Sequence, residues 1–251
     1  MPDLVCENLA WDSEFFGLRI ARLLPRRLTV EIVEEAETWC RAGKIDCLYF
    51  LADSDDPHTV RIAEDRRFRF LDVRVTLARP IAPHGGADSA VSPEMVRAFR
   101  GEDMPALRRL ARASHRDSRF YADPMFPDSA CDALYETWIE KSCAGYADAV
   151  FVAEVDSAPA GYATVHRDKD SRGRVGLIAV DPGAQKKGLG KALAAAMFDW
   201  CRRESLQSIG VVTQGRNIPA QRLYARCGFL PESFQFWYHR WFAHPCGTDL
   251  P

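Results

Sequence analysis

The sequence has no excess of charge of either sign, no long apolar run and no leader-like start. Its 33 Lys and Arg residues nearly balance 35 Asp and Glu residues, for a formal net charge of -2 at pH 7. A near-neutral chain does not bind nucleic acid through bulk electrostatic attraction. No apolar run approaches the ~20 residues of a membrane span, and residues 1–8 lack the basic and apolar regions of a signal peptide. We therefore expect a cytoplasmic protein with no membrane span and no nucleic-acid partner.

Paired metal-ligand motifs are absent as well. The eight cysteines form no Cys-x-x-Cys pair, and no Cys/His spacing typical of a zinc site occurs. Cysteines scattered in this way are most simply explained as reduced thiols, so we expect neither a metal nor a disulfide framework. With 251 residues, 47% of them hydrophobic, the chain is long and apolar enough for one large or two small domains.

The most informative stretch, residues 174–203, has the pattern of a strand, a tight loop and a helix. Residues 175–180 form a continuous apolar run, as expected for a strand buried on both faces. Pro182 ends this strand because proline cannot donate to a sheet ladder. Beyond the loop, apolar side chains recur at helical spacing, at Leu189, Leu193, Ala196, Met197 and Trp200.

The loop between this strand and this helix has the composition of an anion site. Gly188 and Gly190 lie one residue apart, and the flanking cations are Lys186, Lys187 and Lys191. Free backbone N–H groups at a helix start, the positive end of the helix dipole and nearby ammonium groups all attract phosphate. Glycine also lets a phosphate approach the backbone without meeting a Cβ atom.

Two common phosphate loops do not fit this stretch. A Walker loop needs glycine where Gln185 stands and Ser or Thr where Ala192 stands. A dinucleotide-binding loop needs a third glycine where Leu193 stands. The pattern that remains is Gln-x-x-Gly-x-Gly after a strand that ends in Ala-Val-Asp-Pro. On this motif alone, an ordinary Gly-rich turn between strand and helix stays open.

A second motif covers residues 217–229. Asn217 and Tyr224 are seven residues apart, which is two helical turns, so they share a helix face. Pro219 suits the first turn of this helix, and Gly228 suits its left-handed end. Taken separately, Asn217 is explained as an N-cap and Tyr224 as a core residue.

Together the two motifs resemble the GCN5-related N-acetyltransferase (GNAT) family. The matching patterns are Gln-x-x-Gly-x-Gly and Asn-x-x-Ala-x-x-Leu-Tyr-x-x-x-Gly-Phe, in the family's order. The resemblance implies an α/β (α+β) GNAT fold, with a mixed central sheet, helices on both faces, and acetyl-CoA as cosubstrate. The CoA contacts that it implies are Ile178, Ala179, Val180, Gln185, Lys186, Lys187, Gly188, Leu189, Gly190, Lys191, Ala192, Asn217 and Tyr224.

The same resemblance implies direct attack of a neutral amine on the acetyl carbonyl. A backbone N–H on the strand that ends at Val180 would stabilise the developing oxyanion. Tyr224 would protonate the leaving CoA thiolate as general acid. The amine needs a base, and the candidates on the preceding hairpin are Glu154 and His166. Each is more simply explained as a solvated strand residue, since a water chain would serve instead.

The remaining sequence divides into α/β units. The expected order is a smaller N-terminal domain, a linker rich in Pro and Gly, the acetyltransferase domain and a tail, at residues 1–79, 80–93, 94–242 and 243–251. In the first unit, Thr29 is expected to cap a helix that runs to Cys40. Phe-Leu pairs in both units follow a helix and precede a strand, which suggests that the first unit is a degenerate half-copy of the second.

A narrower resemblance, to the dTDP-fucosamine acetyltransferase family, covers nearly the whole chain. It rests on the opening Trp-Asp-Ser-Glu-Phe-Phe-Gly, the Phe-Leu-Asp-Val-Arg-Val strand, the Ser-Arg-Phe-Tyr-Ala-Asp-Pro loop and the closing Trp-Tyr. It implies a nucleotide-linked amino sugar as substrate, bound between the two units. Within the polar loop expected at residues 114–124, it implies that Arg119 meets the diphosphate and Tyr121 the ring.

Several alternatives stay open at this stage. After the nucleotide-linked amino sugar, the next candidate for the amine acceptor is another small amine or a protein amino terminus. A non-catalytic acyl-CoA-binding module is a further alternative, against which Tyr224 argues. The oligomeric state is undetermined, so a homodimer is also open.

Overall fold

The computed structural model describes residues 4–82, 95–168 and 170–242. The expected tail lies outside the described residues, and so does the expected linker apart from residues 80–82. Ten described strands form one mixed sheet in the order β1-β2-β3-β10-β4-β9-β8-β7-β6-β5. Their bounds are β1 Cys6–Asn8, β2 Ile20–Leu23, β3 Cys47–Asp53, β4 Arg69–Pro80, β5 Val96–Ala98, β6 Ala149–Val155, β7 Ala158–Asp168, β8 Arg172–Val180, β9 Ser208–Gln214 and β10 Leu230–Trp241.

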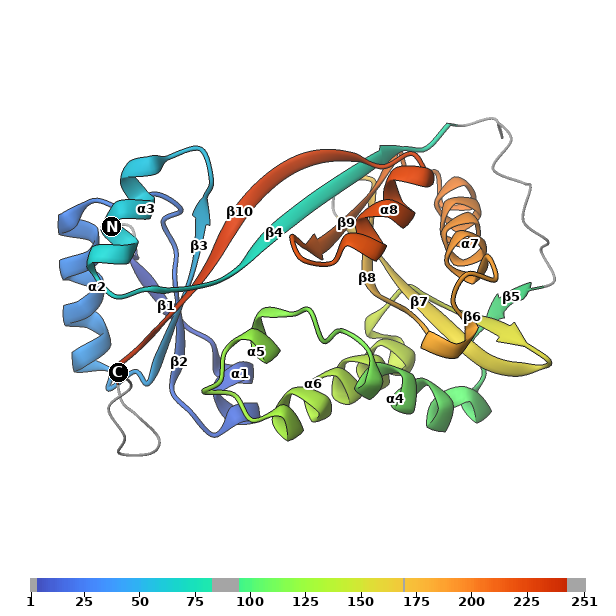
Figure 1. Ribbon diagram of the computed structural model, residues 1–251, viewed down its shortest axis with the longest axis horizontal. Helices are drawn as coiled ribbons and strands as arrows, with labels where there is room; N and C mark the ends of the chain where they lie inside the picture. Colours follow the sequence, from blue (N-terminus) through green and yellow to red (C-terminus); the bar gives the residue numbers. More distant parts are fainter. Residues whose placement is uncertain (1–3, 83–94, 169, 243–251) are drawn as a thin grey trace.

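The two longest strands, β4 and β10, join the N-terminal part of the molecule to the rest (Figure 1). β10 pairs antiparallel with β3 on one side and with β4 on the other, and β4 also pairs with β9. The expected units at residues 1–79 and 94–242 therefore share one sheet. Whether they are separate folding units stays a prediction.

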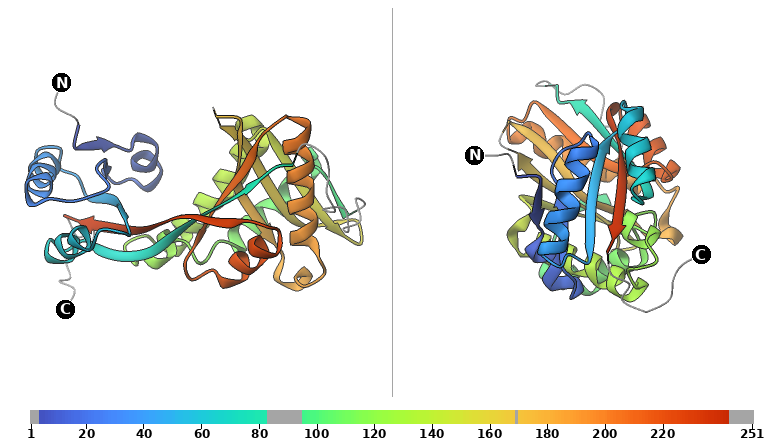
Figure 2. Two further views of the ribbon diagram at one scale, coloured as in Figure 1. Left: turned by 90° about the horizontal axis from the view of Figure 1, so that it is seen from above. Right: turned by 90° about the vertical axis from the view of Figure 1, so that its left-hand side faces the viewer.

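Helices cover both faces of this sheet, which confirms the expected fold class (Figures 1 and 2). On one face, α7 and α8 pack in a core that includes Ala163, and on the other α4 and α6 pack in a core that includes Tyr162. These neighbours on β7 point to opposite faces because side chains alternate along a strand. The described α-helices are α1 Ala10–Phe16, α2 Val30–Ala42, α3 Pro57–Asp65, α4 Met104–Ala113, α5 Arg119–Ala122, α6 Asp128–Lys141, α7 Leu189–Arg203 and α8 Ile218–Arg226.

Local signals in the sequence set several of these helix bounds. Thr29 caps α2 as predicted, since its hydroxyl accepts from the Ile32 N–H at 3.3 Å. The helix ends at Ala42 rather than at Cys40. The loop expected at residues 114–124 contains the short helix α5, so the prediction of an irregular segment was wrong there. Burial of Phe120, which is 2% exposed, holds this turn against the core.

The feature that positions the site is the separation of β8 from β9. The two strands pair in parallel over Arg172–Arg174 and Ser208–Gly210 only. Among the described strands, β8 continues to Val180 with β7 as its one partner, while β9 continues to Gln214 paired with β4. The second half of β8 therefore has an unpaired edge that faces β9 across an opening in the sheet.

Candidate active site

The loop after β8 is held by a hydrogen bond to one of its own side chains, and it places Gly188 directly before α7. The Asp181 carboxylate accepts from the Gly183 N–H at 2.8 Å and begins a single 3-10 turn over Pro182–Ala184. Gly188 has φ 89°, a left-handed conformation in which L side chains are strained, and it directly precedes α7. A Cβ atom built on it meets nothing within 4 Å, so the space above this glycine is open.

The second glycine of the motif lies at a close contact between two helices. Gly190 lies inside α7, and a Cβ atom there would lie 2.9 Å from Leu223 Cδ2 on α8. Gly190 thus lets two helices approach closely, whereas Gly188 supplies the left-handed turn. The cations expected at this loop, Lys186, Lys187 and Lys191, are all exposed around the start of the helix.

The unpaired edge of β8 presents backbone groups to the opening. The Asp181 N–H donates to the Ala160 carbonyl at 2.8 Å, and Ala179 pairs with Tyr162 two residues further along. Hydrogen-bonded pairs alternate along an antiparallel ladder, so the N–H and C=O groups of Ile178 and Val180 point away from β7. One of these four backbone groups already has a contact within the protein, because the Gln185 side-chain amide lies 3.5 Å from the Val180 carbonyl oxygen.

Asn217 and Tyr224 lie on α8, as the second motif predicts. The Asn217 side chain accepts from the Ala220 N–H at 3.1 Å, so it caps the helix through Oδ1. Tyr224 is 3% exposed, and its ring meets Phe229 edge-on with centroids 5.5 Å apart. Burial raises the pKa of the Tyr224 hydroxyl well above its ordinary value, so the phenol is protonated at neutral pH.

The two candidate bases lie in different surroundings. His166, on β7, is 7% exposed, and both burial and the Arg174 charge lower its pKa. A Cβ atom on Gly176 of β8 would lie 2.5 Å from His166 Nε2, so glycine at that position leaves room for the imidazole. Glu154 instead accepts from Arg97 Nε at 2.8 Å, and the same guanidinium also binds Asp103.

Tyr121 and Arg119, the two residues expected at the sugar nucleotide, differ in whether their polar atoms have partners within the protein. The Tyr121 hydroxyl donates to Asp132 Oδ1 at 2.8 Å, and its ring contacts Tyr135 and the Arg116 guanidinium, so its polar atom is engaged within the protein. Arg119 lies over the rings of Trp237 and Tyr49, at 4.1 and 4.9 Å from their centroids. Its Nε atom is buried and has no hydrogen-bond partner in the described part of the chain.

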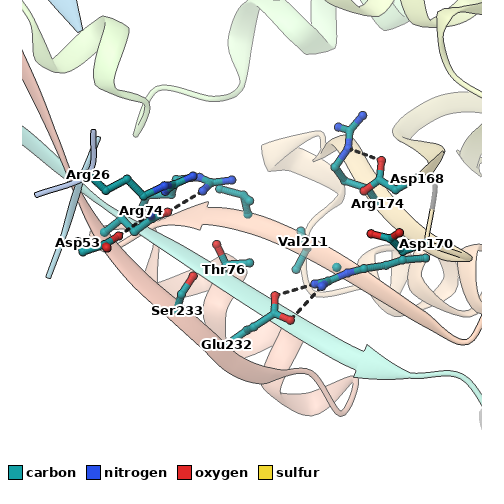
Figure 3. Close-up of a pocket in the computed structure, with 14 residues that line it drawn as sticks. Arg26, Asp53, Arg74, Thr76, Asp168, Asp170, Arg174, Val211, Glu232 and Ser233 are labelled. Atoms are coloured by element: carbon teal, nitrogen blue, oxygen red, sulfur yellow. Dashed lines mark hydrogen bonds and ion pairs between the residues drawn. The ribbon is translucent and has the colours of Figure 1, made fainter. Parts of the chain in front are cut away.

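A cavity of about 510 Å³ lies on the face of the sheet that carries His166 and Arg174 (Figure 3). It extends from Arg174 on β8 across β9 to Arg74 on β4 and Arg26 beyond β2. Arg26 and Arg74 were missed in the sequence analysis. The alternation of polar residues along 69–80 contains a signal for Arg74, because Asp72, Arg74 and Thr76 fall on one face of that strand.

Among the described residues, no three His, Cys, Asp or Glu side chains come together closely enough to hold a metal ion. The described helices also include none with the length and apolar character needed to cross a membrane.

Comparisons with known proteins match this chain to acetyltransferases. Residues 106–229 match the model of the acetyltransferase (GNAT) family. A dTDP-fucosamine acetyltransferase from Escherichia coli O6:H1 is 26% identical, over 93% of this chain and 97% of its own. The spore coat polysaccharide biosynthesis protein SpsD from Bacillus subtilis is 30% identical, over 55% of this chain and 48% of its own.

Among solved structures, a GCN5-related N-acetyltransferase from Sphaerobacter thermophilus superposes with a TM-score of 0.69. The match covers 98% of this chain and 78% of that one at 16% identity, and it shows the fold. The unpaired edge of β8, the glycine before α7 and the matched family model all fall within one segment of the chain. This protein therefore belongs, through the domain at residues 106–229, to the GNAT family of acetyltransferases.

Proposed function

We propose that this protein transfers the acetyl group of acetyl-CoA to the primary amine of a nucleotide-linked amino sugar. The observation that carries the proposal is the opening between β8 and β9, which ends at the Gly188 loop. An opening with backbone donors along one edge and cations at its end fits a molecule that has amide groups in a chain and phosphates at one end.

The residues that would hold acetyl-CoA follow from these features. The backbone of Ile178 and Val180 would bind the amide-bearing arm, in the manner of an added strand. The N–H groups that begin α7, together with the lysines of the loop, would bind the pyrophosphate, and the open space above Gly188 would admit it. When bound, acetyl-CoA supplies the activated acetyl group, and the protein contributes orientation and proton transfer.

Tyr224 is the proposed general acid. Its buried phenol keeps its proton at neutral pH, as a donor to a leaving thiolate must, and it projects from a helix whose start at Asn217 lies beside the end of β9. The Ile178 or Val180 N–H is the proposed donor to the developing oxyanion, because neither has a partner on β9.

Of the two candidate bases, we favour His166. Its lowered pKa keeps the imidazole neutral at pH 7, and it lies against Gly176 on the strand that borders the opening. The Glu154 carboxylate is instead engaged by the Arg97 guanidinium, which also binds Asp103. We therefore propose that Glu154 joins β6 to β5 rather than taking the amine proton.

The substrate class is supported by the relatives. One is named for acetylation of a dTDP-linked amino sugar and covers nearly all of this chain, and another is named for polysaccharide biosynthesis. The full-length match includes the N-terminal part, which supplies β3 and β4 next to the cavity.

The test is release of free thiol from acetyl-CoA in the presence of a panel of nucleotide amino sugars, free amino sugars, small amines and peptides. Turnover that is fastest with one nucleotide amino sugar supports the proposal. Turnover confined to free amines or peptide amino termini would contradict the proposed nucleotide-sugar substrate and identify the acceptor as that amine class instead. Binding of CoA with no turnover on any amine would indicate that the protein is a non-catalytic acyl-CoA-binding module.

A further inference from the structure

Two arginines, Arg26 and Arg74, line one end of the cavity, and a third, Arg119, lies nearby over Trp237. We infer that Arg26, Arg74 and Arg119 form the site for the diphosphate of the acceptor, with Arg26 and Arg74 lining the cavity and Arg119 over Trp237, two residues along β10 from the Gln235 partner of Arg74. The inference rests on the proposed function, because a nucleotide-linked acceptor is what brings a diphosphate to this place.

The first argument is the pairing of charges around the cavity. Arg172 binds Glu232 through two hydrogen bonds of 2.9 and 2.7 Å, and Arg174 binds Asp168 at 3.3 Å. In the described residues, by contrast, no carboxylate lies within ion-pair distance of Arg26, Arg74 or Arg119. Figure 3 shows Arg26 and Arg74 together with Asp53 at one end of the cavity, away from Arg174. The carboxylate at that end, Asp53, accepts from Gln235 Nε2 at 3.2 Å and lies 3.8 Å from Arg27, and it is not within ion-pair distance of Arg26 or Arg74.

The second argument is that these arginines lie close to one another. Arg74 Nη1 donates to Gln235 Oε1 at 2.8 Å, and Trp237, two residues along β10 and on the same face, contacts the Arg119 guanidinium. Burial lowers the pKa of Arg74, and the charges of Arg26 and Arg119 lower it further. Like charges held together in a half-buried place repel each other, and a bound anion relieves that repulsion.

The third argument comes from polar atoms without partners near Arg119. The Arg119 Nε atom and the Tyr49 hydroxyl are both buried and lack hydrogen-bond partners within the described residues, and the Arg119 guanidinium lies over the Tyr49 ring. Buried polar groups are nearly always hydrogen-bonded, so such atoms mark a place where a ligand or water belongs. Here they lie beside the unpaired positive charge.

The chemistry of the three side chains selects the ligand. A guanidinium presents two parallel N–H groups that match the oxygens of a phosphate, and neighbouring guanidinium groups match neighbouring phosphates. Arg74 lies on β4, beside β9, and the same cavity reaches Arg174, the cross-strand partner of His166. A diphosphate bound at Arg74 thus directs the attached sugar along the cavity toward the proposed base.

Binding of dTDP to the full chain, measured by calorimetry without acetyl-CoA, tests the inference. We expect dTDP to bind at least 10-fold more tightly than TMP, because TMP lacks the second phosphate. Arg74→Gln should weaken dTDP binding at least 10-fold, and Arg26→Gln and Arg119→Lys should weaken it less. The matched control is Arg172→Gln, which removes an arginine from the same cavity that already has a carboxylate partner. It should change the affinity less than 2-fold.

Thermal unfolding of each variant without ligand shows whether a loss of affinity reflects loss of the fold. The inference is overturned if wild type and Arg74→Gln bind dTDP with equal affinity. It is also overturned if wild type binds TMP as tightly as dTDP, or if Arg172→Gln loses as much dTDP affinity as Arg74→Gln. Turnover of a nucleotide amino sugar that is indifferent to Arg74 also overturns it, while leaving the proposed function in place. Conversely, dTDP binding that depends on Arg74, without turnover on any amine, removes the proposed function and leaves the anion site.

Discussion

The two ends of the proposed reaction site are built from different parts of the polypeptide. On the proposed acetyl-CoA side, the backbone groups and the glycine turn lie within residues 176–192. The proposed acceptor side would use side chains from the loop after β2, from β4 and from α5, which are far apart in the sequence. A site made of backbone is determined by a short motif, whereas a site made of side chains requires the strands to be assembled first. Four predictions test this difference.

The largest effect is expected for Tyr224→Phe. The substitution keeps the ring and its contact with Phe229 and removes only the hydroxyl, so stability and CoA affinity should change little. Loss of a positioned general acid costs ~10²–10⁴-fold in rate, and the loss should appear in kcat. An acyl donor whose thiol has a lower pKa should lose less. Equal losses with both donors would assign Tyr224 to positioning, and no loss would make it a packing residue.

The next effect concerns His166 and pH. Burial and Arg174 lower its pKa below the ordinary 6.5, so the imidazole is neutral at pH 7 and becomes protonated only as the pH falls through the lowered value. The acid limb of kcat/KM should therefore have its midpoint below pH 6.5. His166→Gln should lower kcat by ~10²-fold and remove that limb. The control is the exposed His58, whose replacement by Gln should leave the profile unchanged. An unaltered acid limb in His166→Gln would assign the proton transfer to water.

Arg119→Ala addresses the acceptor side. Hydrogen bonds to charged groups contribute ~1.5–3 kcal/mol, so the KM for a nucleotide amino sugar should rise about 10-fold or more, with the KM for acetyl-CoA nearly unchanged. The control is Arg108→Ala, because Arg108 already pairs with Glu136 and Glu140 on α6. A rise in both Michaelis constants would mean that Arg119 supports the fold around Trp237 instead of the acceptor.

The smallest effects separate the two glycines of the loop. Gly188→Ala forces a left-handed φ on an L residue, a strain of ~1–2 kcal/mol, and its Cβ enters open space. We expect it to reduce the thermal protection given by CoA. Gly190→Val presses on Leu223 and should lower unfolding stability by ~1–3 kcal/mol, partly restored by Leu223→Ala. Equal protection by CoA in wild type and Gly188→Ala would place the pyrophosphate elsewhere.

Several elements were predictable from sequence because their causes are local. Thr29 and Asn217 cap helices through neighbouring N–H groups, and Gly188 and Gly228 take left-handed conformations where helices begin or end. Other predictions missed what distant residues contribute. The loop around Arg119 forms a turn of helix because Phe120 is buried against residues from α1 and β3. Gly190 is small because α8 packs on it.

The sequence by itself determined the α/β pattern, the glycine loop after the apolar strand and the Asn217 to Tyr224 spacing, because each depends on residues within two helical turns or one strand. Only the tertiary structure decided that β4 and β10 bring the N-terminal part into the same sheet. It also decided which arginines are paired and which are not: Arg172 has Glu232 as its partner, while Arg74 has no carboxylate among the described residues. Charge pairing across a sheet depends on strand order and register, and neither is encoded in any short segment of the chain.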